Sequence, residues 1–476
     1  MLAVACALMP AWAAERIDLL VRGADVLDIV DGHWRSQHAI AIDDGRIVAV
    51  LPDAEAGRYA PERTLDARGK YAIPALWDMH VHFGGGPGAV EDNLDLLPLY
   101  LAHGITGVRD AAGDLAGEVL DWRDDVARGE RAGPRIFTSG PKIEGLKPIW
   151  KGVLEVGSTE DLTAALDRLQ AMQVDFVKIT DNTLDTGLFL ETLRETDKRG
   201  LTTSAHVPYR LTIDDASAAG LDSIEHLDYL FKAGSPLEAS LGAAIADGTL
   251  SSREAYEQWN ASFDPERARA TYRRLAERGT VVVPTLNGSR VVAYLDQDDH
   301  RDDAYLKYIG PELQATYAWR VERAGKDSPE DIARRHHRFE TVAGTTLPLL
   351  QEAGVVVLAG TDAGYLNSFN YPGIGLHDEL GWLVRYGITP LNALRGATIH
   401  GARFLKQQRD YGSLDAGKVA DILLLDADPV ADITATRRIH ALVKHGAVLD
   451  RAQLDGMLDT VAARVAERRH AASTPD

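Results

Sequence analysis

Short β-branched runs alternate with longer helical patterns between residue 71 and about residue 402. The apolar runs lie at 71–80, 104–110, 134–140, 175–180, 201–206, 222–226, 280–286 and 354–362. Strands that alternate with helical stretches are typical of βα units around a parallel sheet. Between two of them, residues 158–172 predict a helix that begins with a Ser-x-x-Asp cap. Eight such units predict an α/β fold, a (β/α)₈ TIM-type barrel, over residues 71–402.

The chain on either side of this block has a different pattern. Residues 15–70 and 403–450 contain short strand-like runs separated by Asp-Gly, Lys-His-Gly and Asp-Ala-Gly corners. Because the two flanks are alike, we expect them to pair into one small β-sandwich domain beside the barrel. Residues 451–476 predict a charged helix that ends in a polar tail.

Two intervals between the predicted strands, 227–279 and 287–353, are longer than one crossover helix requires. The second interval has a strongly helical and charged pattern, which predicts a helical lid over about residues 287–345. Long loops at the C-terminal face of a barrel usually shape its active site.

The charge balance excludes some classes of partner. The chain has 51 Lys and Arg against 71 Asp and Glu, a net charge of −20, which repels nucleic acid and anionic membrane surfaces. A small-molecule substrate is the expected partner. Cys6 is the only cysteine, so neither an intramolecular disulfide nor a thiolate metal cluster can form.

The N-terminal segment resembles an export signal. Residues 1–14 form an apolar run that ends in the small-x-small pattern Ala11-Trp12-Ala13, which favours a periplasmic or secreted protein. The positively charged start of such a signal is missing, so a cytoplasmic protein stays open as the alternative. No other segment approaches the roughly 20 continuous apolar residues of a membrane span.

Several metal-ligating residue types lie at the C-terminal ends of the predicted strands. His80 and His82 are two residues apart, so both imidazoles lie on the same side of their strand. In a barrel these strand ends meet at one mouth, where catalysis takes place. Two imidazoles with a carboxylate there suit a divalent metal ion. The candidate ligands are His80, His82, Lys178, His206, His226 and Asp362.

The ordered set of motifs resembles the amidohydrolase superfamily, specifically its imidazolonepropionase-like and prolidase-like branch. The motifs are "DMHVHF", "FVKIT", "SAHVP", "IEHL", "AGTDAG" and the closing run from "TPLNALRGATIHG" to "DILLLDADP". The resemblance extends from about residue 17 to about residue 450.

This resemblance implies a binuclear centre of two divalent ions, with Zn²⁺ as the first choice. His80, His82 and Asp362 would hold the more buried ion, and His206 and His226 the more exposed one. Lys178 would bridge both ions as N6-carboxylysine. His and carboxylate ligands also accept manganese, iron or cobalt. A bridging lysine disfavours the deaminases of the superfamily, which are typically mononuclear.

The substrate-side residues are predicted from their positions near the strand ends. Tyr209 and Tyr229 could polarise a scissile carbonyl, and Arg210 could bind a substrate carboxylate. His377 resembles a helix-start histidine of the family, and we group it with the substrate-binding residues, behind the ligands.

One loop departs from the family pattern. After the third strand many relatives carry a substrate-contacting histidine, whereas this chain has Lys142, Lys147 and Trp150 in that region. Two lysines there favour an anionic substrate group.

These residues together predict a metal-dependent hydrolase that cleaves an amide or peptide C–N bond by attack of a metal-bridging hydroxide. Asp362 would take the proton of the attacking water and pass it to the leaving amine. The expected substrate is an N-acyl amino acid, a dipeptide or an ochratoxin-type amide. A lactonase, carbamate hydrolase or phosphotriesterase is the alternative, and an inactive barrel that binds a ligand is the alternative of another class. A homo-oligomer stays open.

Overall fold

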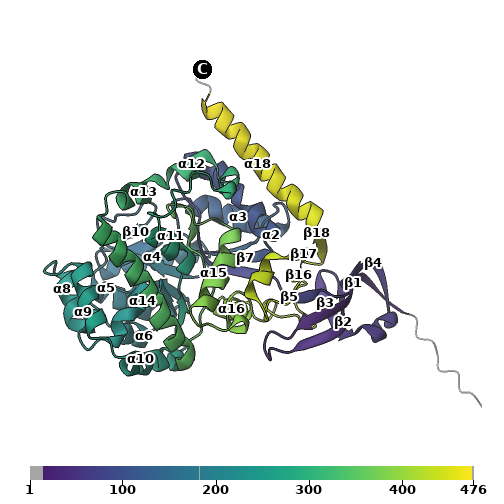
Figure 1. Cartoon of the computed structure of the whole chain (residues 1–476), viewed down its shortest axis with the longest axis horizontal. Coiled ribbons are helices and arrows are strands. Elements are labelled where there is room, and N and C mark those ends of the chain that lie inside the picture. The colour runs from purple at the N-terminus through teal and green to yellow at the C-terminus, as the bar shows by residue number, and fades with distance from the viewer. Residues whose placement is uncertain (1–13, 182, 474–476) are drawn as a thin grey trace, which may run out of the picture.

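The computed structural model describes residues 14–181 and 183–473. The predicted export signal and Cys6 lie outside the described residues. Figure 1 shows a body of helices around central strands and, beside it, a flank made mostly of strands. Within the described part of the chain, no helix is both long enough and apolar enough to cross a membrane.

The strands of the body form two parallel sheets. One has the order β10-β9-β11-β12-β13-β14 and the other the order β15-β6-β7-β8. Their bounds are Leu76–His82 (β6), Ile105–Asp110 (β7), Arg135–Thr138 (β8), Ile143–Glu144 (β9), Leu154–Glu155 (β10), Val177–Ile179 (β11), Thr203–Ala205 (β12), Ser223–Glu225 (β13), Val281–Val283 (β14) and Ala363–Gly364 (β15). With the helices around them, these strands make a TIM-barrel-like arrangement (Figure 1).

The predicted eighth strand is corrected in its extent. Instead of a continuous strand over 354–362, the structure has an isolated parallel bridge between Val282 and Val357, and then the short β15. The backbone nitrogen of Met79 donates to Ala359 O at 2.9 Å, which holds this segment beside β6. The approach is so close that a Cβ at Gly360 would lie 2.8 Å from the backbone nitrogen of His80. Because the backbones pack this closely, the segment does not form a continuous hydrogen-bonded strand.

The flank is one sheet made from both ends of the chain. Its order is β18-β17-β16-β5-β1-β2-β3, and β4 pairs with β1. The antiparallel pairing of β16 with β5 joins the two ends. Since hydrogen bonds connect these strands into a single sheet, the two-layer sandwich stays a prediction. The bounds are Glu15–Leu27 (β1), Trp34–Asp43 (β2), Arg46–Pro52 (β3), Tyr59–Asp66 (β4), Tyr71–Pro74 (β5), Ile422–Leu425 (β16), Ile439–Lys444 (β17) and Ala447–Asp450 (β18).

The strand expected at 71–80 is divided between the two parts of the molecule. β5 pairs with β1 and β16 in the flank, whereas β6 pairs with β7 and β15 in the body. The change of partners occurs at Ala75, whose nitrogen donates to Asp421 O in the flank. The next nitrogen, of Leu76, donates to Gly104 O in the body.

Helices cover the outside of the body and its C-terminal end. Their bounds are Val90–Leu94 (α1), Leu96–Ala102 (α2), Ala116–Arg128 (α3), Thr159–Ala171 (α4), Thr186–Lys198 (α5), Ile213–Ala218 (α6), Asp228–Phe231 (α7), Glu238–Ala246 (α8), Ser252–Ala261 (α9), Pro265–Arg278 (α10), Leu286–Ala293 (α11), Pro311–Ala315 (α12), Ala318–Ala324 (α13), Pro329–Ala353 (α14), Ile374–Arg385 (α15), Pro390–Gly396 (α16), Ile399–Phe404 (α17) and Arg451–Ser473 (α18). Short 3₁₀ helices lie at Asp53–Arg58, Pro87–Ala89, Lys232–Gly234, Ala304–Tyr308 and Ile433–Arg437. The predicted cap of α4 is present, since the Ser158 hydroxyl accepts from the nitrogen of Asp161 at 3.1 Å.

The helix α18 leaves the flank sheet and packs on α2 of the body (Figure 1). Leu454, Val461 and Val465 form its buried stripe at helical spacing. Arg464 and Arg468 pair with the buried Asp95. The C-terminal helix is therefore part of the folded structure rather than a free tail.

Candidate metal centre

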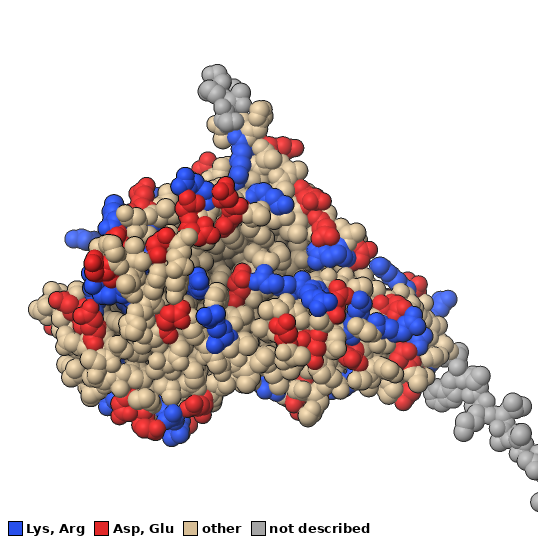
Figure 2. Space-filling model, viewed as in Figure 1, with Lys and Arg blue, Asp and Glu red and all other residues tan. Residues whose placement is uncertain are grey.

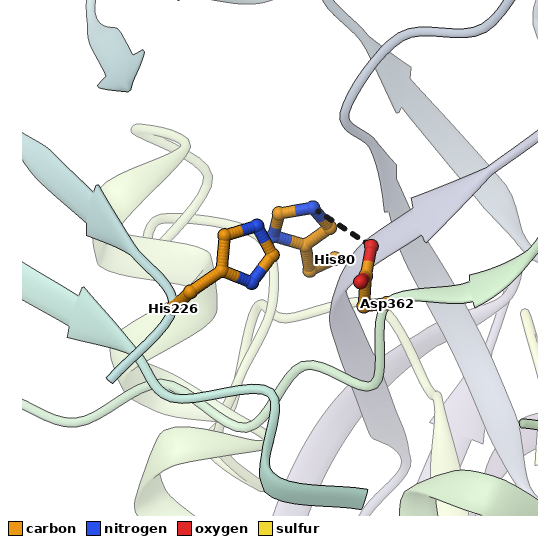
Figure 3. Close-up of side chains that lie close together, drawn as sticks. All are labelled: His80, His226 and Asp362. Atoms are coloured by element: carbon orange, nitrogen blue, oxygen red, sulfur yellow. Dashed lines mark ion pairs between the residues drawn. The ribbon is translucent and has the colours of Figure 1, made fainter. Parts of the chain in front are cut away.

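The six candidate ligands converge at the C-terminal ends of the body strands. Side-chain ligand atoms of His80, His226 and Asp362 all lie within 4.8 Å of one another. Figure 3 shows these three side chains pointing toward a common centre from three separate segments. The parallel direction of the strands produces this meeting, because it brings all their C-terminal ends to one side.

His80, His82 and Asp362 form one half of the cluster. The Nε2 atoms of the two histidines lie 3.2 Å apart. Asp362 Oδ1 lies 3.4 Å from His80 Nε2 and 2.9 Å from His82 Nε2. His82 Nδ1 lies 2.5 Å from the carbonyl of Ala112, which can only accept, so Nδ1 carries the proton. Nε2 is then the ring nitrogen of His82 that is directed at the centre.

His206 and His226 form the other half. Their Nε2 atoms are 3.1 Å apart, and the Thr285 hydroxyl lies 2.8 Å from His226 Nδ1. Asp181 Oδ1 lies 3.6 Å from His206 Nδ1. Nε2 atoms that meet in pairs beside a carboxylate form a donor set that suits cations.

Lys178 lies on β11 beneath these histidines and is buried. Its Nζ has no hydrogen-bond partner among the described residues. Burial lowers the pKa of Lys178 to about 8, and the nearby Glu225 carboxylate opposes that shift. A buried, unpartnered amine is costly, which indicates that a further group completes this position.

A buried network that the sequence did not reveal holds His80. Glu225 Oε2 accepts from His80 Nδ1 at 2.6 Å, and Arg109 Nη2 lies 2.8 and 2.7 Å from the two Glu225 oxygens. The hydroxyls of Ser204 and Ser223 also donate to Glu225 Oε1. The carboxylate fixes the tautomer of His80, so that Nε2 offers its lone pair to the centre. The only sequence signal was Glu225 beside His226 in "IEH".

The electrostatics keep the imidazoles neutral. Burial lowers the pKa of His80 and of His226 to about 3 and that of His206 well below its usual value. Burial by itself would raise the pKa of Asp362, but the hydrogen bond with His82 and the neighbouring histidines hold it below the usual range. Neutral imidazoles and an ionised carboxylate are the protonation states that bind a metal ion.

Two of the ligands have an unusual backbone. His226 has φ of 68° and Asp362 has φ of 63°, in the left-handed region that side chains with a Cβ rarely adopt. Such conformations cost about 1–3 kcal/mol each and persist where the surroundings determine them. Here His226 N donates to Val283 O at 2.8 Å and Asp362 N donates to His80 O at 2.7 Å. Neighbouring strands thus impose the direction of both side chains.

A comparison with protein-family models identifies the family of this chain. The model of the amidohydrolase family matches residues 71–449. The chain belongs to this family. It is 25% identical over 418 residues to the imidazolonepropionase of Chromobacterium violaceum, covering 83% of this chain and 87% of that protein. The resemblance inferred from the motifs is confirmed, and the protein is a hydrolase of TIM-barrel-like fold.

Two solved structures are similar to this chain in fold. Bottromycin amidohydrolase superposes with a TM-score of 0.74 at 21% identity, covering 94% of this chain and 90% of that one. A Xaa-Pro dipeptidase with bound methionine in the active site gives a TM-score of 0.66 at 21% identity, covering 91% of this chain and 99% of that one.

A cavity of about 430 Å³ opens at the ligand cluster of this amidohydrolase. His226 and Asp362 lie in its wall, and so do Tyr209 and Tyr229. The Tyr229 hydroxyl lies 3.3 Å from both oxygens of Asp181. The structure therefore brings both predicted tyrosines to the cluster.

The predicted substrate lysines differ in their placement. Lys142 is mostly buried with its Nζ 4.6 Å from the centre of the Trp150 ring, and burial lowers its pKa to about 8. Asp362 is among the groups that act on Lys142 electrostatically. Lys147 is exposed on the same loop.

None of the four predicted substrate-binding residues, the two lysines included, lies in the cavity wall that the described residues form. Arg210 points away and pairs with Asp247 at the surface. His377 is buried between Thr436 and the carbonyl of His103, each 3.0 Å from one of its ring nitrogens. Adjacency to a ligand in sequence does not fix direction, which explains the misplacement of Arg210.

Two arginines that the sequence did not single out lie in the cavity wall. Arg320 comes from α13 and Arg338 from α14. The Nε and Nη2 atoms of Arg320 donate to Leu366 O and Asn367 Oδ1, and Arg338 pairs with Asp228. They belong to the predicted helical segment, but a charged helix face did not show which of its arginines turn inward.

Proposed function

We propose that this chain is a metal-dependent amidohydrolase that cleaves an amide or peptide C–N bond of a small, carboxylate-bearing substrate. The observation that carries the proposal is the buried, unpartnered amine of Lys178 on β11, in a site that also holds four histidines and Asp362. No set of hydrogen bonds within the chain accounts for that arrangement in the described residues.

The residues present fit a centre of two divalent ions, with zinc as the first choice. His80, His82 and Asp362 would hold one ion, and His206 and His226 the other. Lys178 would complete the site as N6-carboxylysine: its neutral amine attacks the carbon of CO₂ and releases one proton, which leaves a carbamate. That group is a carboxylate equivalent with two oxygens, and it removes the cost of a buried bare amine.

When bound, divalent ions would supply Lewis acidity toward the scissile carbonyl and toward water. Asp362 accepts the proton of the attacking water at Oδ1 or Oδ2 and delivers it to the leaving amine nitrogen, for which its position among the histidines suits it. Tyr209 and Tyr229 lie in the wall of the same cavity, where their hydroxyls can donate to the carbonyl oxygen.

Arg320 is our candidate for the substrate carboxylate. Its guanidinium is already held by two neutral oxygens, and it lacks a carboxylate partner among the described residues. An arginine in that state can form charge-assisted bonds with an incoming carboxylate. This assignment replaces Arg210 as the carboxylate-binding group.

Metal analysis and one substitution test the centre. We expect about two divalent ions per chain, and we expect Lys178→Ala to lose metal and activity while keeping its fold by circular dichroism. Added propionate should restore part of the activity, because it can supply the missing carboxylate. Lys198→Ala, an exposed lysine, is the control. A fully active Lys178→Ala variant would contradict the bridge.

A substrate panel tests the bond. Rates for N-acyl amino acids and dipeptides are compared with those for lactones, carbamates and aryl phosphotriesters under the same conditions. We expect the amides to have the highest kcat/KM. Faster turnover of a lactone or phosphotriester would overturn the proposed bond type but would not contradict the proposed metal centre.

A further inference from the structure

A second cavity continues outward from the one at the ligand cluster. It has a volume of about 900 Å³ and is lined mainly by α9, α13 and α14; we call it the outer chamber. Asp228, Arg320 and Arg338 lie in the walls of both cavities. The two spaces therefore adjoin, and together they exceed what a dipeptide requires.

The charge of the outer chamber is opposite to that of the protein. Six arginines and four carboxylates lie in its wall, an excess of two positive charges in a chain of net charge −20. Four of the arginines have carboxylate partners: Arg253 and Arg334 pair with Asp331, Arg335 pairs with Asp327 and Asp296, and Arg338 pairs with Asp228. The excess positive charge therefore comes from the other two arginines, Arg320 and Arg323.

These two arginines are neighbours on α13. Arg320 and Arg323 are three residues apart, which places their side chains on one face with Cβ atoms about 5–6 Å apart. Neither has a carboxylate partner among the described residues. Like charges at this spacing repel each other, so the protein itself gains nothing from the pair. A ligand with two negative groups would offset the repulsion.

We propose that Arg320 and Arg323 form a receptor for a dicarboxylate leaving group, so that the substrate is an amide of an acidic amino acid. This inference rests on the proposed amide hydrolysis. Arg320, at the junction of the cavities, binds the α-carboxylate, and Arg323, in the outer chamber, binds the side-chain carboxylate. Glutamate, which carries both an α-carboxylate and a side-chain carboxylate, is the test case for such a leaving group.

A pair of substrates that differ in one charge tests the receptor. N-acetylglutamate and N-acetylglutamine have the same shape, and we expect kcat/KM to favour the glutamate by about tenfold or more, the effect of one charge-assisted hydrogen bond. Arg323→Gln should bring the ratio close to one, chiefly by lowering kcat/KM for the glutamate substrate. Lys326→Gln removes the same charge one turn further along, outside the chamber, and should leave the ratio unchanged.

Two results would overturn the receptor: equal kcat/KM for the two substrates, or the same preference in Arg323→Gln as in the parent. If neither amide is hydrolysed, the proposed bond specificity fails, and calorimetry then decides on the receptor alone. Glutamate should bind more tightly than glutamine, and this difference should vanish in Arg323→Gln and persist in Lys326→Gln. Equal binding of the two amino acids would refute the receptor.

Discussion

The ligand cluster and the outer chamber differ in how deeply their ionisable side chains are buried and in what holds those side chains in place. In the cluster His80 and Lys178 are buried and the other four candidate ligands are half-buried, and buried partners such as Glu225 and Thr285 fix two of the histidines. In the outer chamber the arginines come from neighbouring helices, three of them are exposed and three half-buried, and most pair with nearby carboxylates. Figure 2 shows that acidic and basic side chains are interspersed over this face of the molecule.

From this difference we expect the ligand cluster to govern turnover and the outer chamber to govern which substrate is chosen. Buried groups cannot adjust when a partner is removed, because water cannot replace it. Exposed arginines lose little when an ion pair is removed, because solvent takes its place. We therefore expect substitutions in the cluster to affect metal binding, turnover and folding, and substitutions in the chamber to affect the choice of substrate.

The largest effect is expected for Asp362→Asn. The amide keeps an oxygen toward the centre but cannot carry a proton between water and the leaving group, so kcat should fall by about 10²–10⁴-fold. Single-turnover kinetics with the best amide substrate measure this loss, and the far-UV circular dichroism should match the parent. Asp298→Asn, an exposed acid, is the control. Parent-like kcat would remove Asp362 from the proton path.

Glu225→Gln tests how the cluster is held. The substitution leaves Arg109 as a buried, unpaired cation, which should lower the free energy of unfolding by about 3–5 kcal/mol. It also frees the orientation of His80, so metal affinity should fall about 10–100-fold. Thermal unfolding and metal titration measure the two effects, with Glu160→Gln, an exposed acid, as control. Unchanged metal affinity would show that His80 needs no carboxylate behind it.

The carboxyl group of Glu379 accepts a hydrogen bond from the backbone of α11, and a substitution of Glu379 tests this contact. Val292 of the same helix lies in the walls of both cavities. Burial raises the pKa of Glu379 to about 8, although its carboxyl accepts from Asn287 N at 2.7 Å. The folded state thus retains a proton that the unfolded chain releases near pH 4.3, so stability should fall as the pH rises from about 4.3 to about 8.

Glu379→Gln should remove that component of the pH dependence. Its free energy of unfolding, measured in urea at pH 5, 6, 7 and 8, should rise steadily relative to the parent. Parallel curves for the two proteins would mean that Glu379 is ionised in the folded state.

The smallest effect is expected for Arg253→Gln in the outer chamber. Its ion pair with Asp331 is exposed, and Asp331 keeps a second partner in Arg334. Melting temperature and kcat/KM for N-acetylglutamate should both match the parent, since exposed pairs contribute little. A marked loss of glutamate preference would extend the receptor beyond Arg320 and Arg323.

Most of the parallel strands could be located from the sequence, because short β-branched runs between helical patterns are a local signal. The runs at 104–110, 134–140, 175–180, 201–206, 222–226 and 280–286 each contain a strand of the structure. The failures have a common cause: the run at 71–80 changes partners at Ala75, and 354–362 packs too closely against β6 for a regular strand. Both depend on segments far away in the chain.

The site divides in the same way. The sequence by itself determined the types and order of the ligands, since His-x-His spacing and strand ends are local features. Only the tertiary structure decided that Glu225 of β13 supports His80 of β6 and that Arg210 faces outward. It also decided that Arg320 and Arg323 meet no carboxylate in the part of the chain that the structure describes. Periodicity fixes which side of a strand a residue lies on, whereas the partner it meets there is set by the packing of distant segments.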